Sequence, residues 1–296
     1  MVSEKGAKEV CLCTIITPDF MAGALVMLHS FFEHNDWFKG DILIYGEGLR
    51  PKDKELLSLF PNIKYLEPDP EVQSKIEDIL VHRPELAYKK MVFYSLNLFN
   101  LPGYDKYFYI DSDAFFNGSI EELVHMDHGL MCSLDFATYK GFAKNGETFE
   151  LEREPDDSDI YWHRTFNAGI LFIDKKLVNR AIFEDLLALL APKNYIGLKR
   201  PTTDQYLLNQ YFRESFHALP GIYNYRINIS PQIQEKEGFS LNDAKIIHFP
   251  GPKNPWMAHQ VIDTVAQQPL YLEPLKMWHT AYLKMLSDLR TKAQKA

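Results

Sequence analysis

Short apolar segments rich in β-branched residues alternate with segments of helical periodicity along most of this 296-residue chain. The first apolar run covers residues 10–17, ends in a Thr-Pro-Asp turn and leads into a helix-periodic segment over residues 23–32. Such alternation is typical of an α/β fold in which helices cover a largely parallel sheet. The sequence predicts one doubly wound domain with a mixed β-sheet over residues 1–296, with a core over about residues 9–256 and a helical extension over residues 257–296.

The same patterns predict the individual elements. Strands are expected at residues 10–17, 41–46, 63–66, 106–110, 130–135, 165–174 and 244–248. Helices are expected at residues 23–32, 52–60, 68–82, 85–100, 176–190, 202–212 and 271–292. The polar segment over residues 139–164 carries both charge signs, and we expect a loop there, which is either solvated or covers a ligand.

Composition limits the classes of function. Apolar residues make up 46% of the chain and charged residues 24%, as in soluble globular proteins. The net charge of −8 argues against nucleic acid as a partner, because phosphate binding needs a basic face. We expect no transmembrane segment, a cytoplasmic location, and three buried, reduced cysteines, Cys11, Cys13 and Cys132.

An aromatic strand over residues 106–110 runs directly into two aspartates, Asp111 and Asp113. Residues i and i+2 of a strand point to the same face, so the two carboxylates converge on one point. Adjacent carboxylates repel each other unless a cation lies between them, and hard divalent ions take carboxylate oxygens. The pair predicts a metal site at the carboxyl end of a strand; the alternative is a solvated turn in which Asp113 caps the next segment.

Further polar groups follow other predicted strands, namely Asp135, the segment Asn167-Ala168-Gly169, and His248. His248 is interpreted either as a third metal ligand beside the aspartates or as a packed residue. Gly251 permits close approach of the backbone to a ligand, and Lys253 supplies a point charge for a phosphate. A metal ion, a backbone NH and a lysine around one anion form the arrangement that a departing diphosphate requires.

The order of these motifs resembles glycosyltransferase family 8, which includes glycogenin, galactinol synthase and bacterial lipooligosaccharide galactosyltransferases. The resemblance rests on Asp-x-Asp, Phe-Asn-Ala-Gly, Thr-Asp-Gln and a terminal His-x-x-Gly with Lys and Pro-Trp, over roughly residues 10–256. It implies a GT-A fold, a UDP-hexose donor, Mn²⁺ or alternatively Mg²⁺ as cofactor, and transfer with retention of the anomeric configuration.

The resemblance also implies roles for the matching residues. Asp111, Asp113 and His248 match the metal ligands, and Gln205, Asp204 and Asn167 match residues that hold the hexose, which makes them the expected catalytic group. The other expected donor contacts are Thr14, Thr17, Phe20, Lys90, Ser112, Asp135, Ala168, Gly169, Gly251 and Lys253.

Two of these assignments have an alternative interpretation, and one differs from the family's motif. Lys90 is either a donor contact or part of the polar face of an amphipathic helix. Asp204 is either a sugar contact or a residue that stabilises a helix start. The family ending is His-x-x-Gly-x-x-Lys-Pro-Trp, whereas here Lys253 comes one position early and Asn254 occupies the lysine position. We keep Lys253 because its long side chain can reach the same phosphate.

The implied function is transfer of glucose or galactose from a UDP-sugar to a hydroxyl of a carbohydrate, polyol or glycan. Retention then proceeds by front-face substitution or by double displacement through Asp204 or Gln205. One alternative is a self-glucosylating primer protein, with Tyr139, Tyr161 and Tyr195 as candidate acceptors. Others are a non-catalytic nucleotide-sugar binding protein and a phosphohydrolase of the haloacid-dehalogenase kind. The last helix carries Trp278, Tyr282, Met285 and Leu289 on one side, and we expect it to pack on the domain; homodimerisation through it is the alternative.

Overall fold

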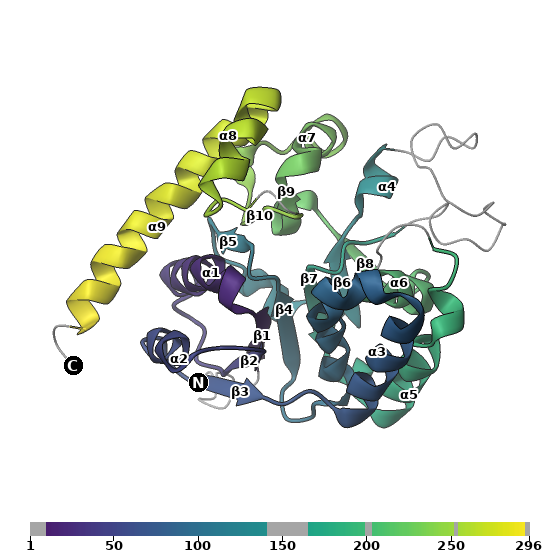
Figure 1. Cartoon of the computed structure of the whole chain (residues 1–296). Coiled ribbons are helices and arrows are strands. Elements are labelled where there is room, and N and C mark those ends of the chain that lie inside the picture. The colour runs from purple at the N-terminus through teal and green to yellow at the C-terminus, as the bar shows by residue number, and fades with distance from the viewer. Residues whose placement is uncertain (1–9, 141–164, 199–202, 252–253, 294–296) are drawn as a thin grey trace. The chain divides into compact units, whose positions relative to one another are not determined.

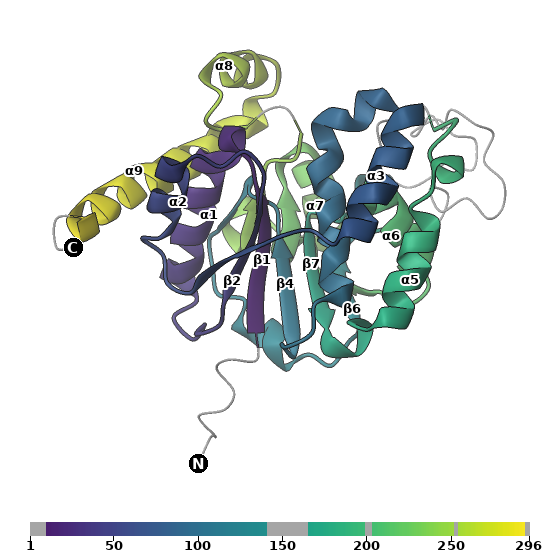
Figure 2. The ribbon, with the colours of Figure 1, turned by 60° about the horizontal axis from the view of Figure 1, so that its bottom comes forward.

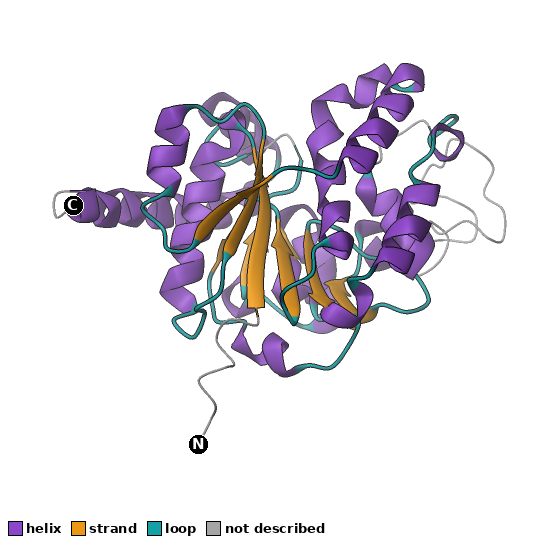
Figure 3. Ribbon diagram, turned by 90° about the horizontal axis from the view of Figure 1, so that it is seen from below, coloured by secondary structure: helices purple, strands orange, loops and turns teal. Residues whose placement is uncertain are grey.

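The computed structural model describes residues 10–140, 165–198, 203–251 and 254–293. The chain, which Figure 1 colours by residue number, divides into two compact units. Unit 1 comprises Met1–Tyr65, Ile110–Met126 and Pro220–Ala296, and unit 2 comprises Leu66–Tyr109 and Asp127–Leu219. Each unit contains both strands and helices, which Figure 3 distinguishes by colour. The prediction that the whole chain forms one domain stays a prediction.

Unit 1 begins with the predicted strand–helix–strand order. Strand β1 (Val10–Ile16) is buried along almost its whole length and pairs in parallel with β2 (Ile42–Gly46). Helix α1 (Met21–His34) connects them, and α2 (Pro51–Leu57) precedes β3 (Ile63–Leu66). The strands lie in the order β3-β2-β1, with α1 and α2 beside them in Figure 2. A parallel strand covered by helices carries a continuous apolar run, and this is the sequence pattern of β1.

A separate three-stranded sheet in unit 1 was not predicted. It consists of β5 (Ala114–Phe116), β10 (Ile246–His248) and β9 (Tyr225–Arg226), in the order β5-β10-β9. Strand β10 is antiparallel to β5 and parallel to β9. The sequence pattern does not indicate this sheet because three strands this short carry little periodicity.

The rest of unit 1 is helical. It contains the 3-10 helix η8 (Gly221–Asn224) and the helices α7 (Ser230–Glu237), α8 (Ala258–Gln267) and α9 (Leu272–Ala293). Helix α9 packs beside α1, as Figure 1 shows. Trp278 and Met285 of α9 are buried, which confirms the predicted packing of the last helix. Helices α7 and α8 were not predicted.

Unit 2 contains a mixed set of strands, in the order β4-β7-β6-β8. These are β4 (Lys106–Ile110), β7 (Ile170–Asp174), β6 (Leu130–Ser133) and β8 (His217–Leu219); β6 is antiparallel to β7 and parallel to β8. Its helical segments are α3 (Pro70–His82), η3 (Pro84–Asn100), α4 (Phe136–Lys140), α5 (Arg180–Leu189) and α6 (Asp204–Phe212). Of these, α3, α5, α6 and η3 pack together (Figure 2).

Two segments of unit 2 differ from the sequence interpretation. The segment predicted as an amphipathic α-helix over residues 85–100 is the 3-10 helix η3; Glu85 and Tyr88 in its first half are exposed, whereas residues 93–99 are all buried. The polar segment expected as a loop over residues 139–164 begins within α4, and its residues 141–164 lie outside the described part.

The cysteines match one expectation from composition. Cys11, Cys13 and Cys132 are buried, and burial raises the pKa of Cys13 above its usual value, which keeps the thiol protonated. Among the helices of the described part, none combines the length and the apolar character that a membrane span requires.

Candidate functional site

Asp111, Asp113 and His248 come together in unit 1, as the metal-site interpretation predicts. Their ligand atoms all lie within 4.8 Å of one another. His248 Nε2 is 3.1 Å from Asp113 Oδ1 and 3.9 Å from Asp111 Oδ2. The β5–β10 pairing causes this placement, because it sets His248 opposite Ala114, and the NH of Phe249 donates to the carbonyl of Asp113 at 3.1 Å.

One hydrogen bond orients the His248 ring in this cluster. Its Nδ1 donates to Asn224 Oδ1 at 2.8 Å, and in the neutral tautomer that makes this bond Nε2 carries a lone pair that faces the carboxylates. Asp113 Oδ1 is buried and has no hydrogen-bond partner within the described part. Lone pairs that face each other this closely repel unless a cation lies between them. Adjacent ligands of an octahedral ion with bonds of ~2.1 Å are ~3 Å apart, which agrees with the Nε2–Oδ1 distance. The three residues therefore fit a divalent metal ion.

Asn224 is a site residue that the sequence interpretation missed. It ends η8, is 1% exposed and fixes the orientation of the His248 ring. Metal-binding histidines usually donate their second NH to such an acceptor, which sets the tautomer. An asparagine 24 positions before the histidine belongs to no motif, so no pattern in a single sequence identifies it.

The turn that carries the aspartates packs tightly against the start of α1. A Cβ atom at Gly23 would lie 2.3 Å from the carbonyl oxygen of Ser112 and 2.5 Å from the ring of Trp256. Trp256 Nε1 donates to the carbonyl of Asp19 at 2.9 Å, and its ring meets Phe20 edge-on with centroids 5.5 Å apart. The absence of a side chain at Gly23 thus permits the close approach of three segments. This close approach accounts for a glycine at this helical position, where helix propensity alone would disfavour it.

The remaining donor contacts predicted in unit 1 stay predictions. Thr14 is fully buried in β1, and Thr17 precedes a 3-10 turn without capping it through its side chain. Gly251 has φ +100°, a conformation that favours glycine. Lys253 lies outside the described residues. Asn254, at the family's lysine position, is buried, and its Oδ1 has no hydrogen-bond partner within the described part.

In unit 2, the expected sugar-binding residues form one hydrogen-bonded network around Gln205. Gln205 Nε2 donates to Asp135 Oδ2 at 2.9 Å. Its Oε1 accepts from Asn167 Nδ2 at 2.9 Å and from the backbone NH of Ala168 at 3.3 Å. The NH of Gly169 donates to Asn167 Oδ1 at 3.2 Å. The structure thus brings together residues from three separate motifs and fixes the orientation of the Gln205 amide.

Asp204 has a different environment from Gln205, although both lie in the first turn of α6. It is 2% exposed, and its carboxylate accepts from Ser95 Oγ at 2.7 Å and from Thr203 Oγ1 at 3.2 Å. Burial raises the pKa of Asp204 to about 6, and the hydrogen bonds from Ser95 and Thr203 oppose the rise. Thr203 occupies the N-cap position but does not cap the helix, so its hydroxyl serves Asp204 instead. The sequence interpretation missed Ser95.

The remaining candidates in unit 2 are the predicted donor contact Lys90 and the tyrosines considered as acceptors. Lys90 is half-buried in η3, and its role as a donor contact stays a prediction. Tyr139 and Tyr195 are 2% and 0% exposed, so their hydroxyls are poor acceptors for self-glucosylation. Tyr161 lies outside the described residues.

Comparison with known proteins agrees with this arrangement. The chain is 24% identical to glycogenin of Neurospora crassa over 284 residues, which cover 95% of this chain and 36% of glycogenin. It is 26% identical to galactinol synthase 7 of Arabidopsis thaliana over 286 residues, covering 86% of this chain and 76% of the relative. The chain spans only about a third of the length of the first two curated relatives it matches.

A solved structure shares the fold. The galactosyltransferase LgtC, in complex with donor and acceptor sugar analogues, aligns with a TM-score of 0.67 at 16% identity, covering 95% of this chain and 99% of LgtC. The mixed α/β fold of GT-A glycosyltransferases is thereby confirmed. The profile described as glycosyl transferase family 8 matches residues 11–260. The chain therefore belongs to glycosyl transferase family 8.

Proposed function

We propose that this protein is a retaining, metal-dependent hexosyltransferase that uses a UDP-sugar. The observation that carries the proposal is the cluster of Asp111, Asp113 and His248, in which a histidine ring nitrogen lies 3.1 Å from a buried carboxylate oxygen that accepts no hydrogen bond within the described part. This donor set suits Mn²⁺ better than Mg²⁺, because imidazole is a poor ligand for magnesium. When bound, the ion neutralises charge on the donor diphosphate.

Separate groups of residues bind the diphosphate and the hexose of the donor in this proposal. We assign Lys253 and the backbone around Gly251 to the leaving diphosphate, following the match to the family's terminal motif. We assign Gln205, Asn167 and Asp135 to the hexose, since their network in unit 2 presents a rigid set of amide and carboxylate groups. Fixed polar groups of this kind orient a sugar without reorganising during the reaction.

The network also bears on how the anomeric configuration is retained. A double displacement needs an attacking oxygen, and Gln205 Oε1 already accepts two hydrogen bonds, which lowers its nucleophilicity. The carboxylate of Asp204 is buried and holds two hydroxyl donors. We therefore favour front-face substitution, in which the departing phosphate takes the proton of the acceptor hydroxyl.

Donor and acceptor are proposed from the relatives. Glycogenin and galactinol synthases among the relatives favour glucose or galactose as the transferred sugar. We propose a hydroxyl of a carbohydrate, polyol or glycan as acceptor, and the cytoplasm as location because the three cysteines are buried and reduced.

Donor turnover tests the proposal. Purified protein is incubated with UDP-, GDP- and CDP-sugars, with Mn²⁺ or with chelator, and nucleotide release is followed. We expect release from one UDP-hexose only with metal, and its loss in Asp113→Asn. Asp127→Asn is the matched control, because Asp127 is an exposed carboxylate paired with Lys176. Metal-independent release would contradict the metal assignment, and absence of both release and calorimetric binding for the whole panel would refute the function.

A further inference from the structure

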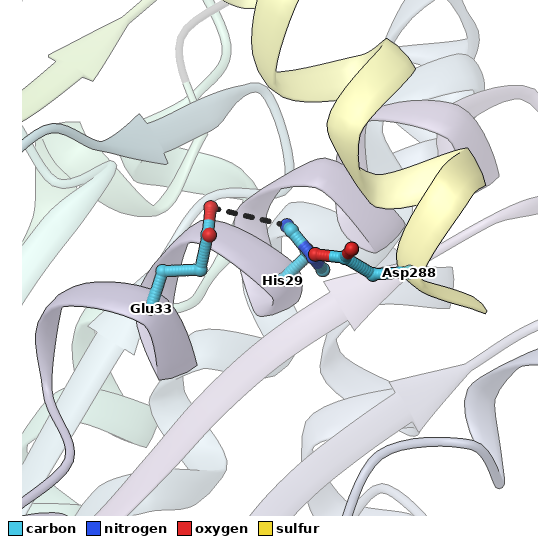
Figure 4. Close-up of side chains that lie close together, drawn as sticks. All are labelled: His29, Glu33 and Asp288. Carbon is cyan, nitrogen blue, oxygen red and sulfur yellow. Dashed lines mark hydrogen bonds and ion pairs between the residues drawn. The ribbon is translucent and has the colours of Figure 1, made fainter. Parts of the chain in front are cut away.

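A second cluster of metal-type ligands lies in unit 1, among residues that the proposed function does not use. His29 and Glu33 are one turn apart on α1, and Asp288 comes from α9 (Figure 4). One ligand atom from each residue lies within 4.8 Å of those of the other two. His29 is 7% exposed, so the ring is enclosed between the two helices rather than free at a surface.

The two ring nitrogens of His29 have different partners. Asp288 Oδ2 lies 3.0 Å from Nε2 and accepts its proton. In that tautomer Nδ1 carries a lone pair, and Nδ1 is buried without a hydrogen-bond partner in the described part of the chain. It faces Glu33 Oε2 at 3.4 Å, as Figure 4 shows. Two ligands of a tetrahedral ion with bonds of 2.0–2.1 Å are about 3.4 Å apart.

We propose that His29 and Glu33 bind a divalent ion of the zinc class, and that Asp288 of the terminal helix α9 holds the His29 ring by accepting its Nε2 proton. Zn²⁺ accepts one imidazole and one carboxylate as ligands, with water in the remaining tetrahedral positions, and a carboxylate behind the histidine is a usual outer partner. Ligands four residues apart on one helix face the same side, so α1 supplies both ligands without distortion. The proposal does not depend on the transferase function.

Lys284 shows that this position attracts cations. Its ammonium contacts Glu33 and lies 2.9 Å from Asp288 Oδ2, and its side chain is 53% exposed. One ammonium leaves the two carboxylates with a net charge of −1, and it makes no hydrogen bond to His29 Nδ1 within the described part. A divalent ion neutralises both carboxylates and engages Nδ1, while the flexible lysine side chain moves into solvent. Lys284 is therefore a competitor of the metal.

The experiment measures Zn²⁺ binding to the full chain, without a histidine tag, by calorimetry and thermal unfolding. Asp113→Asn serves as background, so that the Asp111–Asp113–His248 cluster does not dominate the signal. We expect one remaining Zn²⁺ site, weakened roughly tenfold or more by Glu33→Gln because one ligand is lost. Lys284→Met should tighten binding several-fold, since it removes the competing ammonium.

Matched controls come from the same helix. Lys276 and Glu273 of α9 form an exposed ion pair at 3.0 Å, so Lys276→Met and Glu273→Gln repeat the chemical changes away from the cluster. We expect both to leave Zn²⁺ affinity unchanged. Absence of Zn²⁺ binding in the Asp113→Asn protein would overturn the proposal. So would a Lys284→Met protein that melts at lower temperature with unchanged Zn²⁺ affinity, because the cluster would then be an ion-pair network only.

Discussion

Replacement of Asn224 by alanine tests whether the orientation of His248 controls metal binding. The 2.8 Å hydrogen bond from His248 Nδ1 is buried, since both residues are 1% exposed. Its loss leaves a buried NH without an acceptor, at a cost of about 1–3 kcal/mol. Loss of a histidine-orienting partner typically weakens metal binding by about 10- to 100-fold, which corresponds to a similar free energy. We expect Asn224→Ala to raise the half-saturating Mn²⁺ concentration by that factor.

The assay is Mn²⁺-dependent nucleotide release from the UDP-hexose, together with direct Mn²⁺ titration. Turnover at saturating Mn²⁺ should stay close to that of the unchanged protein, because Asn224 holds a ligand and does not touch the donor. Asn224→Asp is the control, since it keeps an oxygen acceptor and should bind Mn²⁺ at least as tightly. An unchanged metal dependence in Asn224→Ala would refute the argument, provided that thermal unfolding shows a folded protein.

Three further predictions concern other parts of the candidate site. Burial raises the native pKa of Asp204 to about 6 from 3.8, so the stability of the protein falls as pH rises between these values. In urea unfolding, Asp204→Asn should therefore raise the free energy of unfolding at pH 8 by ~1–3 kcal/mol. At pH 4 it should change this free energy little, because Asp204 is then protonated in the native protein. Gly23→Ala places a Cβ 2.3 Å from the Ser112 carbonyl, so unfolding measurements should show a loss of about 1–3 kcal/mol, and a stabilised protein would contradict that close approach. In Gln205→Glu, a carboxylate replaces the amide whose nitrogen lies 2.9 Å from Asp135 Oδ2. An assay of hexose transfer should show no activity at pH 8 and partial recovery towards pH 5, where the two carboxylates share a proton.

Local pattern was sufficient for the strand–helix alternation of the fold but not for its short elements. The run at residues 10–17 predicted β1 to within one residue, because a buried parallel strand carries a nearly continuous apolar run. Strand β10 falls within the strand predicted at residues 244–248, but β5, β9 and β10 contain two or three residues each, and their pairing is set by contacts between distant segments. The spacing over residues 85–100 predicted a helix but not its 3-10 type, because the two helix types have similar periods.

For the candidate site, the motifs located the residues that would touch the donor and missed those that hold them in place. Asp111, Asp113 and His248 were found because a metal needs particular side chains at strand ends. Asn224 and Ser95 act through single hydrogen bonds, Asn224 with His248 and Ser95 with Asp204, and many polar residues could serve equally well. Such partners leave no spacing signal, so only the folded arrangement reveals them.

The two histidine clusters of unit 1 have the same arrangement of histidine and carboxylate groups, but their carboxylates have different contacts. His248 and His29 each donate from one ring nitrogen to an oxygen, and the other nitrogen faces Asp113 at His248 and Glu33 at His29. At His248, the buried Oδ1 of Asp113 has no hydrogen-bond partner in the described part, whereas at His29 both carboxylates already contact Lys284. A metal entering the second cluster must displace that ammonium. Metal should therefore fill the Asp113 cluster first and leave it last, and chelator titration followed by activity and melting temperature should separate the two losses.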